Sequence, residues 1–240
     1  ASYNSRITMT ELRFGLTAPA PCSYLGQQQE QLVFLLAEQP ISASLYQQLL
    51  QINFRRSGEQ VYTPHCPSCQ ACQSVRINGQ TFVPSKSQRR LLNKAKRRQW
   101  HYQLVDQPQD YFALYSRYIQ HKHADGTMYP PDQAHLDAML SCSWLKVGFL
   151  EQYCDSQLVA VTVVDVTEQA LSAVYTFYEP SLSSHSPGIL AVLFLLQLCL
   201  TEQKQWLYLG YQIDACDKMA YKAAFLPQQR FIAGNWHSFG

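Results

Sequence analysis

The chain has 240 residues, of which 47% are hydrophobic and 15% are charged, and its formal net charge is +2 at pH 7. This much apolar surface can bury a large core, so the composition excludes an intrinsically disordered chain. The longest apolar run, residues 188–200, is shorter than the roughly 20 residues that span a bilayer, so it predicts a buried helix and no membrane contact.

Short elements are expected in the first part of the chain, up to about residue 85. Residues 31–37 are typical of a buried strand, and residues 42–54 have the apolar spacing of a helix with Ser42 or Ser44 as its N-cap. Strand pieces then flank a cysteine-rich loop on both sides, in GEQVYTPHC and QSVRI.

The loop carries a cysteine at every third position, Cys66, Cys69 and Cys72, and Cys22 is the best fourth partner by its place in the sequence. Four thiolates would suit zinc or an iron–sulfur cluster. The same spacing also fits reduced thiols packed in a compact loop, and the sequence leaves both interpretations open. Because the first residues are polar and lack the apolar core of an export signal, we expect a cytoplasmic protein whose eight cysteines stay reduced.

A basic helix is predicted over residues 84–100, with Pro84 and Ser85 at its start and no helix breaker after them. No carboxylate occurs between Glu59 and Asp106, so the segment makes a local positive field. The cations of this helix are Lys86, Arg89, Arg90, Lys94, Lys96, Arg97 and Arg98. A solvated surface helix is the plain alternative, but the lack of acidic partners at i,i+4 favours contact with a polyphosphate. No DNA-reading motif is recognisable, so RNA or a nucleotide fits as well as DNA.

The second half has the layout of one mixed sheet with helices. A helix is predicted over residues 110–123, and an antiparallel meander of strands follows from about residue 145. The elements expected after the meander are a loop over 180–187, a helix from Gly188, a strand over 206–211, a helix near 216–225 and a last strand over 230–237. This order predicts an α/β (α+β) fold, which we divide into an N-terminal part, residues 1–105, and a C-terminal part, residues 106–240.

Two further features bear on chemistry. Gly188 stands at the start of a helix that follows a strand and a loop, where backbone N–H groups could face a phosphate or an acyl oxygen. The loop before it lacks the two-glycine signature of acetyl-coenzyme A users, which argues against acetyl transfer. Lys218, Tyr221 and Lys222 are spaced to share one helical face, although ordinary surface lysines would give the same spacing.

Six motifs in chain order resemble those of a known family. They are PCSYLGQQQE, FRRSGEQVYTPHCPSCQACQSVRI, PSKSQRRLLNKAKR, LYSRYIQHKHADGTMYPP, SAVYTFYEP and WLYLGYQIDACDKMAYKAAFLP. From about residue 11 to residue 236, the chain resembles the bacterial aspartate/glutamate leucyltransferases, which are related to eukaryotic arginyl-tRNA–protein transferases. It departs from the family pattern where CSYL replaces CPYL, and where HSPG places Pro187 at a usual leucine.

The resemblance implies a function and a fold. Members of the family transfer leucine from charged tRNA to proteins that begin with Asp or Glu, and the product enters N-degron proteolysis. The implied partners are leucyl-tRNA and acidic N-termini, with no part for DNA, and the implied fold of the C-terminal half is acetyltransferase-like (GNAT). The eukaryotic relatives have N-terminal cysteines linked to metal or iron–sulfur binding, and Cys22, Cys66, Cys69 and Cys72 fall in the corresponding region.

This chemistry suggests roles for individual residues. The aminoacyl ester on tRNA is already activated, so no cofactor is expected to be required, and the enzyme must position substrates, stabilise an oxyanion and remove a proton. Arg76 is the first candidate to bind the carboxylate of the acceptor, followed by Lys218 and Arg55, because the arginine fork suits a carboxylate best.

The other expected roles concern the acceptor, the chemistry and the tRNA. They are Tyr24 and Tyr175 for the free amine or the acceptor backbone, Tyr221 beside the acceptor, Tyr175, Gly188 and His121 as catalytic residues with His123 as a second candidate base, and Lys86, Arg89, Arg90, Lys94, Arg97 and Arg98 for the tRNA acceptor stem.

The sequence alone does not decide between this function and three alternatives. Within the family, the donor could be arginine instead of leucine. Outside it, a non-enzymatic RNA-binding module would bind uncharged tRNA as well as charged tRNA and show no turnover. A small-molecule acyltransferase would bind acetyl-coenzyme A.

Overall fold

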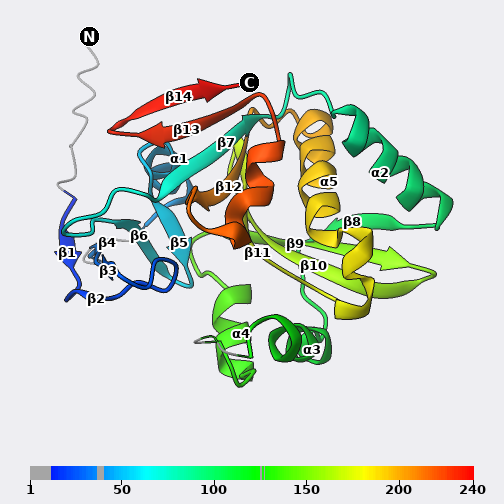
Figure 1. The fold of residues 1–240 in the computed structure, drawn as a ribbon, viewed down its shortest axis with the longest axis horizontal. Helices are drawn as coiled ribbons and strands as arrows, with labels where there is room; N and C mark the ends of the chain where they lie inside the picture. Colours follow the sequence, from blue (N-terminus) through cyan, green and yellow to red (C-terminus); the bar gives the residue numbers. More distant parts are fainter. Residues whose placement is uncertain (1–11, 37–40, 125, 127) are drawn as a thin grey trace, which may run out of the picture.

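The computed structural model describes residues 12–36, 41–124, 126 and 128–240. Within these residues, one large sheet dominates the fold (Figure 1). Its strands are β7 (Gln73–Asn78), β8 (His101–Val105), β9 (Lys146–Cys154), β10 (Gln157–Val166), β11 (Ala170–Tyr178), β12 (Trp206–Gln212), β13 (Gln228–Ile232) and β14 (Asn235–Phe239). They lie in the order β14-β13-β7-β12-β11-β10-β9-β8.

The large sheet is mixed, as the sequence predicts. β9, β10 and β11 form the expected antiparallel meander, whereas β11 and β12 pair in parallel. β7, which follows the cysteine loop, lies between β12 and β13 and is antiparallel to both. The division at residue 105 stays a prediction, and the sheet takes strands from both sides of it.

β11 and β12 separate after a short stretch of pairing. The paired residues are Ala170, Leu171 and Ser172 of β11 with Trp206, Leu207 and Tyr208 of β12. β12 then shifts register between Tyr208 and Gly210, and Gly210 has a φ of 81°, which glycine adopts at little cost. Beyond this point the facing edges of the two strands must find other hydrogen-bond partners.

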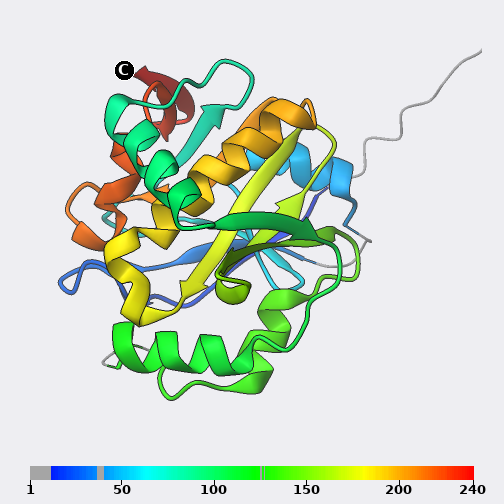
Figure 2. The same cartoon turned by 90° about the vertical axis from the view of Figure 1, so that its right-hand side faces the viewer.

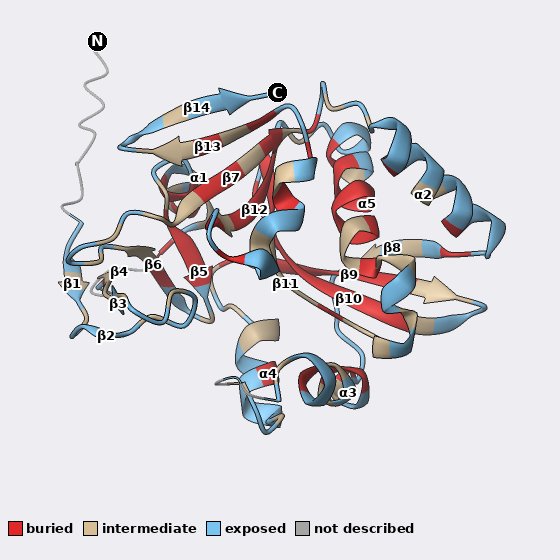
Figure 3. Cartoon of the chain, viewed as in Figure 1, coloured by how far each residue is buried: buried red, intermediate tan, exposed pale blue. Residues whose placement is uncertain are grey.

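Helix α5 (Pro187–Thr201) forms the core on one face of the sheet, as Figures 1 and 2 show from two sides. Side chains alternate across the sheet, so Leu207 and Leu209 of β12 pack with α5 while Tyr208 packs on the opposite face. Helix α2 (Lys86–Arg97) packs against α5, and its buried residue Ala95 belongs to the same core. Buried residues gather in α5 and the central strands (Figure 3).

Smaller elements cover the opposite face. Helix α1 (Ala43–Leu50) packs there, and the Ser42 side chain caps it by accepting from Leu45 N at 3.1 Å. The small strands are β1 (Phe14–Leu16), β2 (Ala20–Pro21), β3 (Gln29–Glu30), β4 (Leu32–Leu35), β5 (Arg55–Ser57) and β6 (Gln60–Pro64). They form a four-stranded sheet, β1-β4-β6-β5, and the pair β2-β3. β4 is the strand predicted over 31–37, whose last residue lies outside the described part of the chain.

Helices α3 (Phe112–Lys122) and α4 (Gln133–Leu140) close the end of the molecule below the meander in Figure 1. Tyr115 and Ile119 of α3 pack with Phe149 and Phe177 of the sheet. Within the described residues, the structure has no helix that is long and apolar enough to cross a membrane.

Two predicted elements near the C-terminus are wrong. Residues 230–237 are not one strand: they are the end of β13, a turn and the start of β14, because Ala233 and Gly234 both have positive φ and reverse the chain. Residues Asp217–Ala224 form a 3-10 segment, η2, in place of the expected α-helix. In a 3-10 helix residues three apart lie on one face, so the helical face predicted for Lys218 and Lys222 does not form.

Candidate active site

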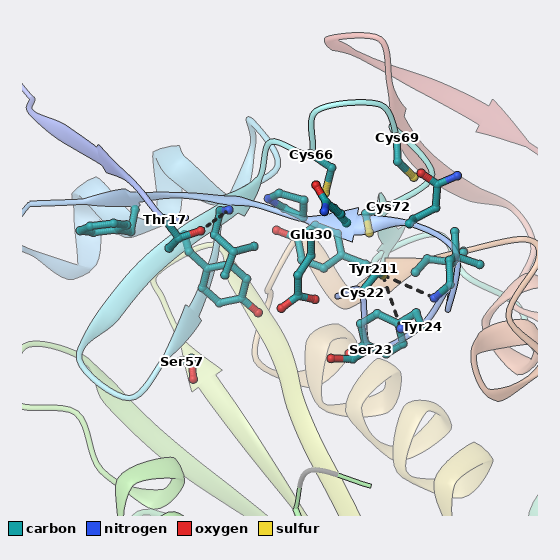
Figure 4. Close-up of a pocket in the computed structure, with 18 of the residues that line it drawn as sticks. Thr17, Cys22, Ser23, Tyr24, Glu30, Ser57, Cys66, Cys69, Cys72 and Tyr211 are labelled. Atoms are coloured by element: carbon teal, nitrogen blue, oxygen red, sulfur yellow. Dashed lines mark hydrogen bonds between the residues drawn. The ribbon is translucent and has the colours of Figure 1, made fainter. Parts of the chain in front are cut away.

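A cavity of about 610 Å³ lies between the cysteine loop, the small sheets and β12 (Figure 4). Its lining includes Cys22, Cys66, Cys69, Cys72, Tyr24, Tyr62, Tyr211, Glu30, Ser57 and Ile213. Figure 4 shows the three loop cysteines together at one end and Ser57 at the other. The structure therefore brings Cys22 and the loop cysteines, far apart in sequence, to one cavity. Tyr24, which is expected from the sequence to bind the free amine or the acceptor backbone, lines the same cavity.

The thiols are held by contacts within the protein. Cys22 Sγ accepts from the backbone N–H groups of Tyr24 and Leu25 at 3.5 and 3.4 Å, and the Cys66 thiol donates to Gln31 O at 3.8 Å. Burial, followed by the neighbouring thiols, raises the pKa of Cys72 to about 12. Among the described residues, no three or more His, Cys, Asp or Glu side chains are arranged to hold a metal ion. These side chains, as placed, do not form a ready ligand set for zinc or an iron–sulfur cluster, and metal binding stays a prediction.

Tyrosines form the wall next to β12. The rings of Tyr62 and Tyr211 lie 6.5 Å apart, and the Tyr211 hydroxyl donates to Asn53 O at 2.7 Å. Burial raises the pKa of both phenols, and the positive charge of Arg55 opposes that rise. Arg55 is thus close to the cavity wall.

Arg55 enters the gap between the diverging strands. Its Nη2 donates to Ala173 O at 2.7 Å, on the first β11 residue beyond the paired stretch. A Cβ atom added at Gly210 would lie 2.9 Å from Nη1, so glycine is needed there to make room for the guanidinium. The side chain is buried, and Nη1 has no hydrogen-bond partner within the described part of the chain.

Lys222 is the second buried cation of this region. Its Nζ donates to Tyr211 O at 2.5 Å. Burial and, after it, the charge of Arg55 lower the pKa of Lys222 to about 7. The sequence singled out Lys218 instead of Lys222, since both fit an exposed helix; only the burial in the 3-10 segment distinguishes them.

Arg76, the first candidate for the acceptor carboxylate, does not line the cavity. Its guanidinium lies between two indole rings, 3.9 Å from the centroid of Trp206 and 4.0 Å from that of Trp236. Its Nε donates to Gln229 Oε1 at 2.8 Å. Both faces of the guanidinium are therefore already used within the protein.

A second group of tyrosines lies where α3 meets β11. The Tyr118 ring contacts the rings of Tyr175 and Tyr178 at 6.3 and 4.9 Å. The Tyr175 hydroxyl is buried, and no residue that the structure describes forms a hydrogen bond with it. Burial raises the pKa of Tyr175, and the charges of Tyr118, Tyr115 and Tyr24 add to the rise.

The remaining candidate residues lie around this region or away from it. Burial and then the charge of Lys218 lower the pKa of His123, so those two residues are neighbours at the end of α3. Tyr221 is partly exposed on η2, and His121 is exposed. Gly188 lies in the first turn of α5, after the left-handed Ser186, with open space where a Cβ would stand.

Helix α2 has the structure that the sequence predicts. Ser85 and Gln88 form a capping box at its start, and Ala95 faces α5. All seven cations of the segment are exposed, and none forms an ion pair with a carboxylate in the described part of the chain. The helix therefore presents an uncompensated positive surface to an anionic partner.

Two family models match the chain. One, described as the C terminus of arginine-tRNA-protein transferase, matches residues 110–232, and the other, described as its N terminus, matches residues 20–90. An aspartate/glutamate leucyltransferase from Aeromonas salmonicida is 44% identical over 231 residues, which cover 95% of this chain and 97% of that protein. A protein of the same name from Vibrio cholerae is 44% identical over 227 residues, which cover 94% of this chain and 97% of the relative.

A solved structure shares the fold. It is the C-terminal domain of a protein described as a lysylphosphatidylglycerol synthetase from Agrobacterium fabrum, with a TM-score of 0.50 and 15% identity, covering 71% of this chain and 58% of that chain. At this identity the likeness concerns the fold alone. With the observed mixed sheet, it confirms the predicted α/β (α+β) class with an acetyltransferase-like (GNAT) sheet.

Proposed function

Because this chain belongs to the arginine-tRNA–protein transferase family, we propose that it transfers leucine from leucyl-tRNA to the α-amine of proteins that begin with Asp or Glu. The observation that carries the proposal is 44% identity over 95% of the chain to an aspartate/glutamate leucyltransferase. The chain is thus an aminoacyltransferase with two substrates, an aminoacyl-tRNA and a protein. The leucine added at the N-terminus creates an N-degron for proteolysis.

The reaction forms an amide bond and breaks an ester bond. The neutral α-amine of the acceptor attacks the leucyl carbonyl and the ester C–O bond breaks. The one proton that the amine gives up ends on the terminal ribose oxygen of tRNA, which leaves as a hydroxyl. An α-amine has a pKa of about 8, so a fair fraction is neutral at pH 7. The ester is activated already, so the protein's task is to align the two substrates and stabilise the tetrahedral oxyanion.

The tyrosines between the cavity and α3 are our candidates for the acceptor amine. Tyr24 lines the cavity, and Tyr175 has a buried hydroxyl without a hydrogen-bond partner among the described residues. A phenol oxygen there can accept a hydrogen bond from the amine as it approaches the ester. His121 and the backbone near Gly188 stay proposals for the base and the carbonyl site; neither lines the thiol-lined cavity.

The tRNA is assigned to helix α2. Its exposed cations, Lys86, Arg89, Arg90, Lys94, Arg97 and Arg98, suit the phosphates of an acceptor stem. The helix has no described acidic partner that would compete with RNA for these cations.

The decisive experiment measures transfer of leucine and of arginine from their charged tRNAs to peptides that begin with Asp, Glu or Arg. We expect leucine on the Asp and Glu peptides and nothing on the Arg peptide, with mass spectrometry as the readout. Absence of transfer to both acidic peptides would contradict the proposal. Binding of uncharged tRNA without turnover would instead support an RNA-binding module, and binding of acetyl-coenzyme A a small-molecule acyltransferase.

Arginine is the second candidate donor, because the matching family models are described by that amino acid. The curated relatives favour leucine. Faster transfer from arginyl-tRNA than from leucyl-tRNA in the same assay would reverse this preference.

The four cavity thiols stay our proposed site for zinc or an iron–sulfur cluster. Because they do not form a ligand set as placed, binding requires Cys22, Cys66, Cys69 and Cys72 to draw together. No step of the transfer depends on it. Elemental analysis of freshly purified protein tests the proposal: about one equivalent of zinc or bound iron that is lost in Cys69→Ser supports it, and protein without either metal contradicts it.

A further inference from the structure

Two cations are buried near the tyrosine wall but do not themselves line the cavity, and neither has a carboxylate partner in the part of the chain that the structure describes. Arg55 is 5% exposed and Lys222 is 7% exposed. Neither forms an ion pair with a carboxylate in the described ranges; each donates to a main-chain oxygen, of Ala173 and Tyr211 respectively. Buried like charges without compensation are costly, so the arrangement calls for an anion.

The free donor has a defined place. Arg55 comes from β5 of the small sheet and ends where β11 and β12 diverge, with Nη1 in the room that the missing Cβ of Gly210 leaves for it. Among the described residues Nη1 has no hydrogen-bond partner, although a guanidinium can make two parallel hydrogen bonds to one carboxylate. Lys222 adds a second cation whose ammonium has donors beyond the one given to Tyr211 O.

We propose that Arg55 and Lys222 bind the side-chain carboxylate of the acceptor's first residue and so determine its selectivity for Asp and Glu. The inference rests on the proposed function and names the part of the site that reads the acceptor. It replaces Arg76, whose guanidinium is enclosed by Trp206 and Trp236.

Other anions of the reaction fit less well. The tetrahedral oxyanion exists only in passing, whereas cations buried in the resting protein match an anion that is charged throughout binding. Phosphates of tRNA have their own exposed cations on α2, which lies outside α5, whereas Arg55 belongs to the small sheet.

The experiment compares peptides that differ only in their first residue, Asp, Glu or Asn, with leucyl-tRNA in excess. Arg55→Gln should lower kcat/KM for the Asp and Glu peptides on the order of 100-fold, because a buried charge loses its partner. The Asn peptide, which has no charge to lose, should change by less than about threefold, and the Kd for tRNA should stay the same. Lys222→Met should shift the Asp-to-Asn ratio in the same direction.

Two variants serve as references. Lys146→Gln removes an exposed cation that does not line the cavity and should keep the wild-type Asp-to-Asn ratio. Arg76→Gln tests the rival assignment and should also keep it. The ratio does not depend on the concentration of active enzyme, so a variant that folds only in part still gives an answer.

An unchanged ratio in Arg55→Gln overturns the inference, as does loss of selectivity in Arg76→Gln alone. If Arg55→Gln binds tRNA more weakly but keeps the Asp-to-Asn ratio, Arg55 contacts a tRNA phosphate instead of the acceptor carboxylate. That result also overturns the inference. Calorimetric titration of the Asp and Asn peptides into the wild type and Arg55→Gln answers without turnover. Preferential Asp binding that Arg55→Gln abolishes supports the inference even if the transferred amino acid is not leucine.

Discussion

The buried ion pair between Arg56 and Asp165 ties the small sheet to the meander. Arg56 Nε and Nη2 donate to Asp165 Oδ1 at 2.9 and 2.5 Å, and the Tyr46 hydroxyl donates to Oδ2 at 2.8 Å. Both charged side chains are 0% exposed. Asp165→Asn leaves the arginine charge buried and uncompensated, so we expect a loss of about 3–5 kcal/mol in the free energy of unfolding, measured with urea.

The matched control is Asp106→Asn, in a pair with Lys146 whose side chains are 61% and 56% exposed. Exposed pairs contribute little, so we expect a change below about 0.5 kcal/mol. Similar losses in the free energy of unfolding of the two variants would show that the buried pair contributes no more to stability than the exposed one.

The lowered pKa of Lys222 predicts that the stability of the fold depends on pH. This pKa is lowered to about 7 by burial and by Arg55, whereas the unfolded side chain keeps the ordinary lysine pKa of 10.5. Between these values the unfolded chain binds one proton more than the folded chain, so stability rises with pH. The thiols of Cys216 and Cys72 oppose this lowering of the pKa.

From pH 7 to pH 9 we expect Lys222 to contribute an increase of about 2 kcal/mol in the free energy of unfolding. In Lys222→Met this increase should be absent, and the variant should be more stable than the wild type at pH 7. Urea unfolding of both proteins at the two pH values gives the difference. Parallel pH profiles would contradict a buried, uncompensated lysine.

The residues of the candidate site could be predicted only in part. Cys22 and the loop cysteines line one cavity with Tyr24, as their motifs suggested. Arg76 looked suitable because it follows the cysteine loop, but it is enclosed by two tryptophans supplied by later strands. Arg55 and Lys222 carry no local signal of burial, because their setting depends on β12 and on the divergence at Gly210, more than a hundred residues after Arg55.

At the scale of elements, α2 leads to a prediction about RNA binding. The triple variant Arg90→Gln, Lys94→Gln, Arg97→Gln removes exposed cations and keeps the capping box that starts the helix. We expect weaker tRNA binding, and a slope of log K against log salt that is smaller by about 2–3, since each phosphate contact contributes about 0.9. Filter binding between low and moderate salt measures the slope.

Ser85→Ala is the structural control for α2. Its hydroxyl accepts from Gln88 N, so its loss should cost about 1 kcal/mol of stability and leave the salt slope unchanged. If the salt slope is unchanged in the triple variant, tRNA binds to a surface other than α2.

Elements with strong local patterns were predicted well. Helices α2, α3 and α5 and the meander follow from apolar periodicity and from Pro or Ser at the helix starts. Helix α4 and strand β8 were missed, because the Asp132 cap and a five-residue strand give weak local signals. The sequence predicts one strand where the structure has the hairpin turn at Gly234, because Ala233 is not a residue type that typically adopts positive φ.

At the scale of the whole molecule, β7 determines how the two predicted parts depend on each other. β7 pairs with β12 on one side and with β13 on the other, so it joins the C-terminal hairpin to the rest of the large sheet. Val75 and Ile77 of β7 are buried in the same core as α5. A fragment of residues 106–240 would lose this strand, the edge strand β8 and the cover of α2.

We therefore expect the full chain to unfold in one cooperative transition and the fragment of residues 106–240 to show none. Without β7, the fragment exposes the edges of β12 and β13 and part of the α5 core to water, and unpaired edges and apolar surface disfavour a folded state. Near-ultraviolet circular dichroism and urea unfolding of both proteins measure this. Adding residues 12–105 in trans is the control, because recovery of the transition would show that the missing strand, and not truncation itself, prevents folding. A fragment that unfolds cooperatively on its own would instead establish residues 106–240 as an independent domain.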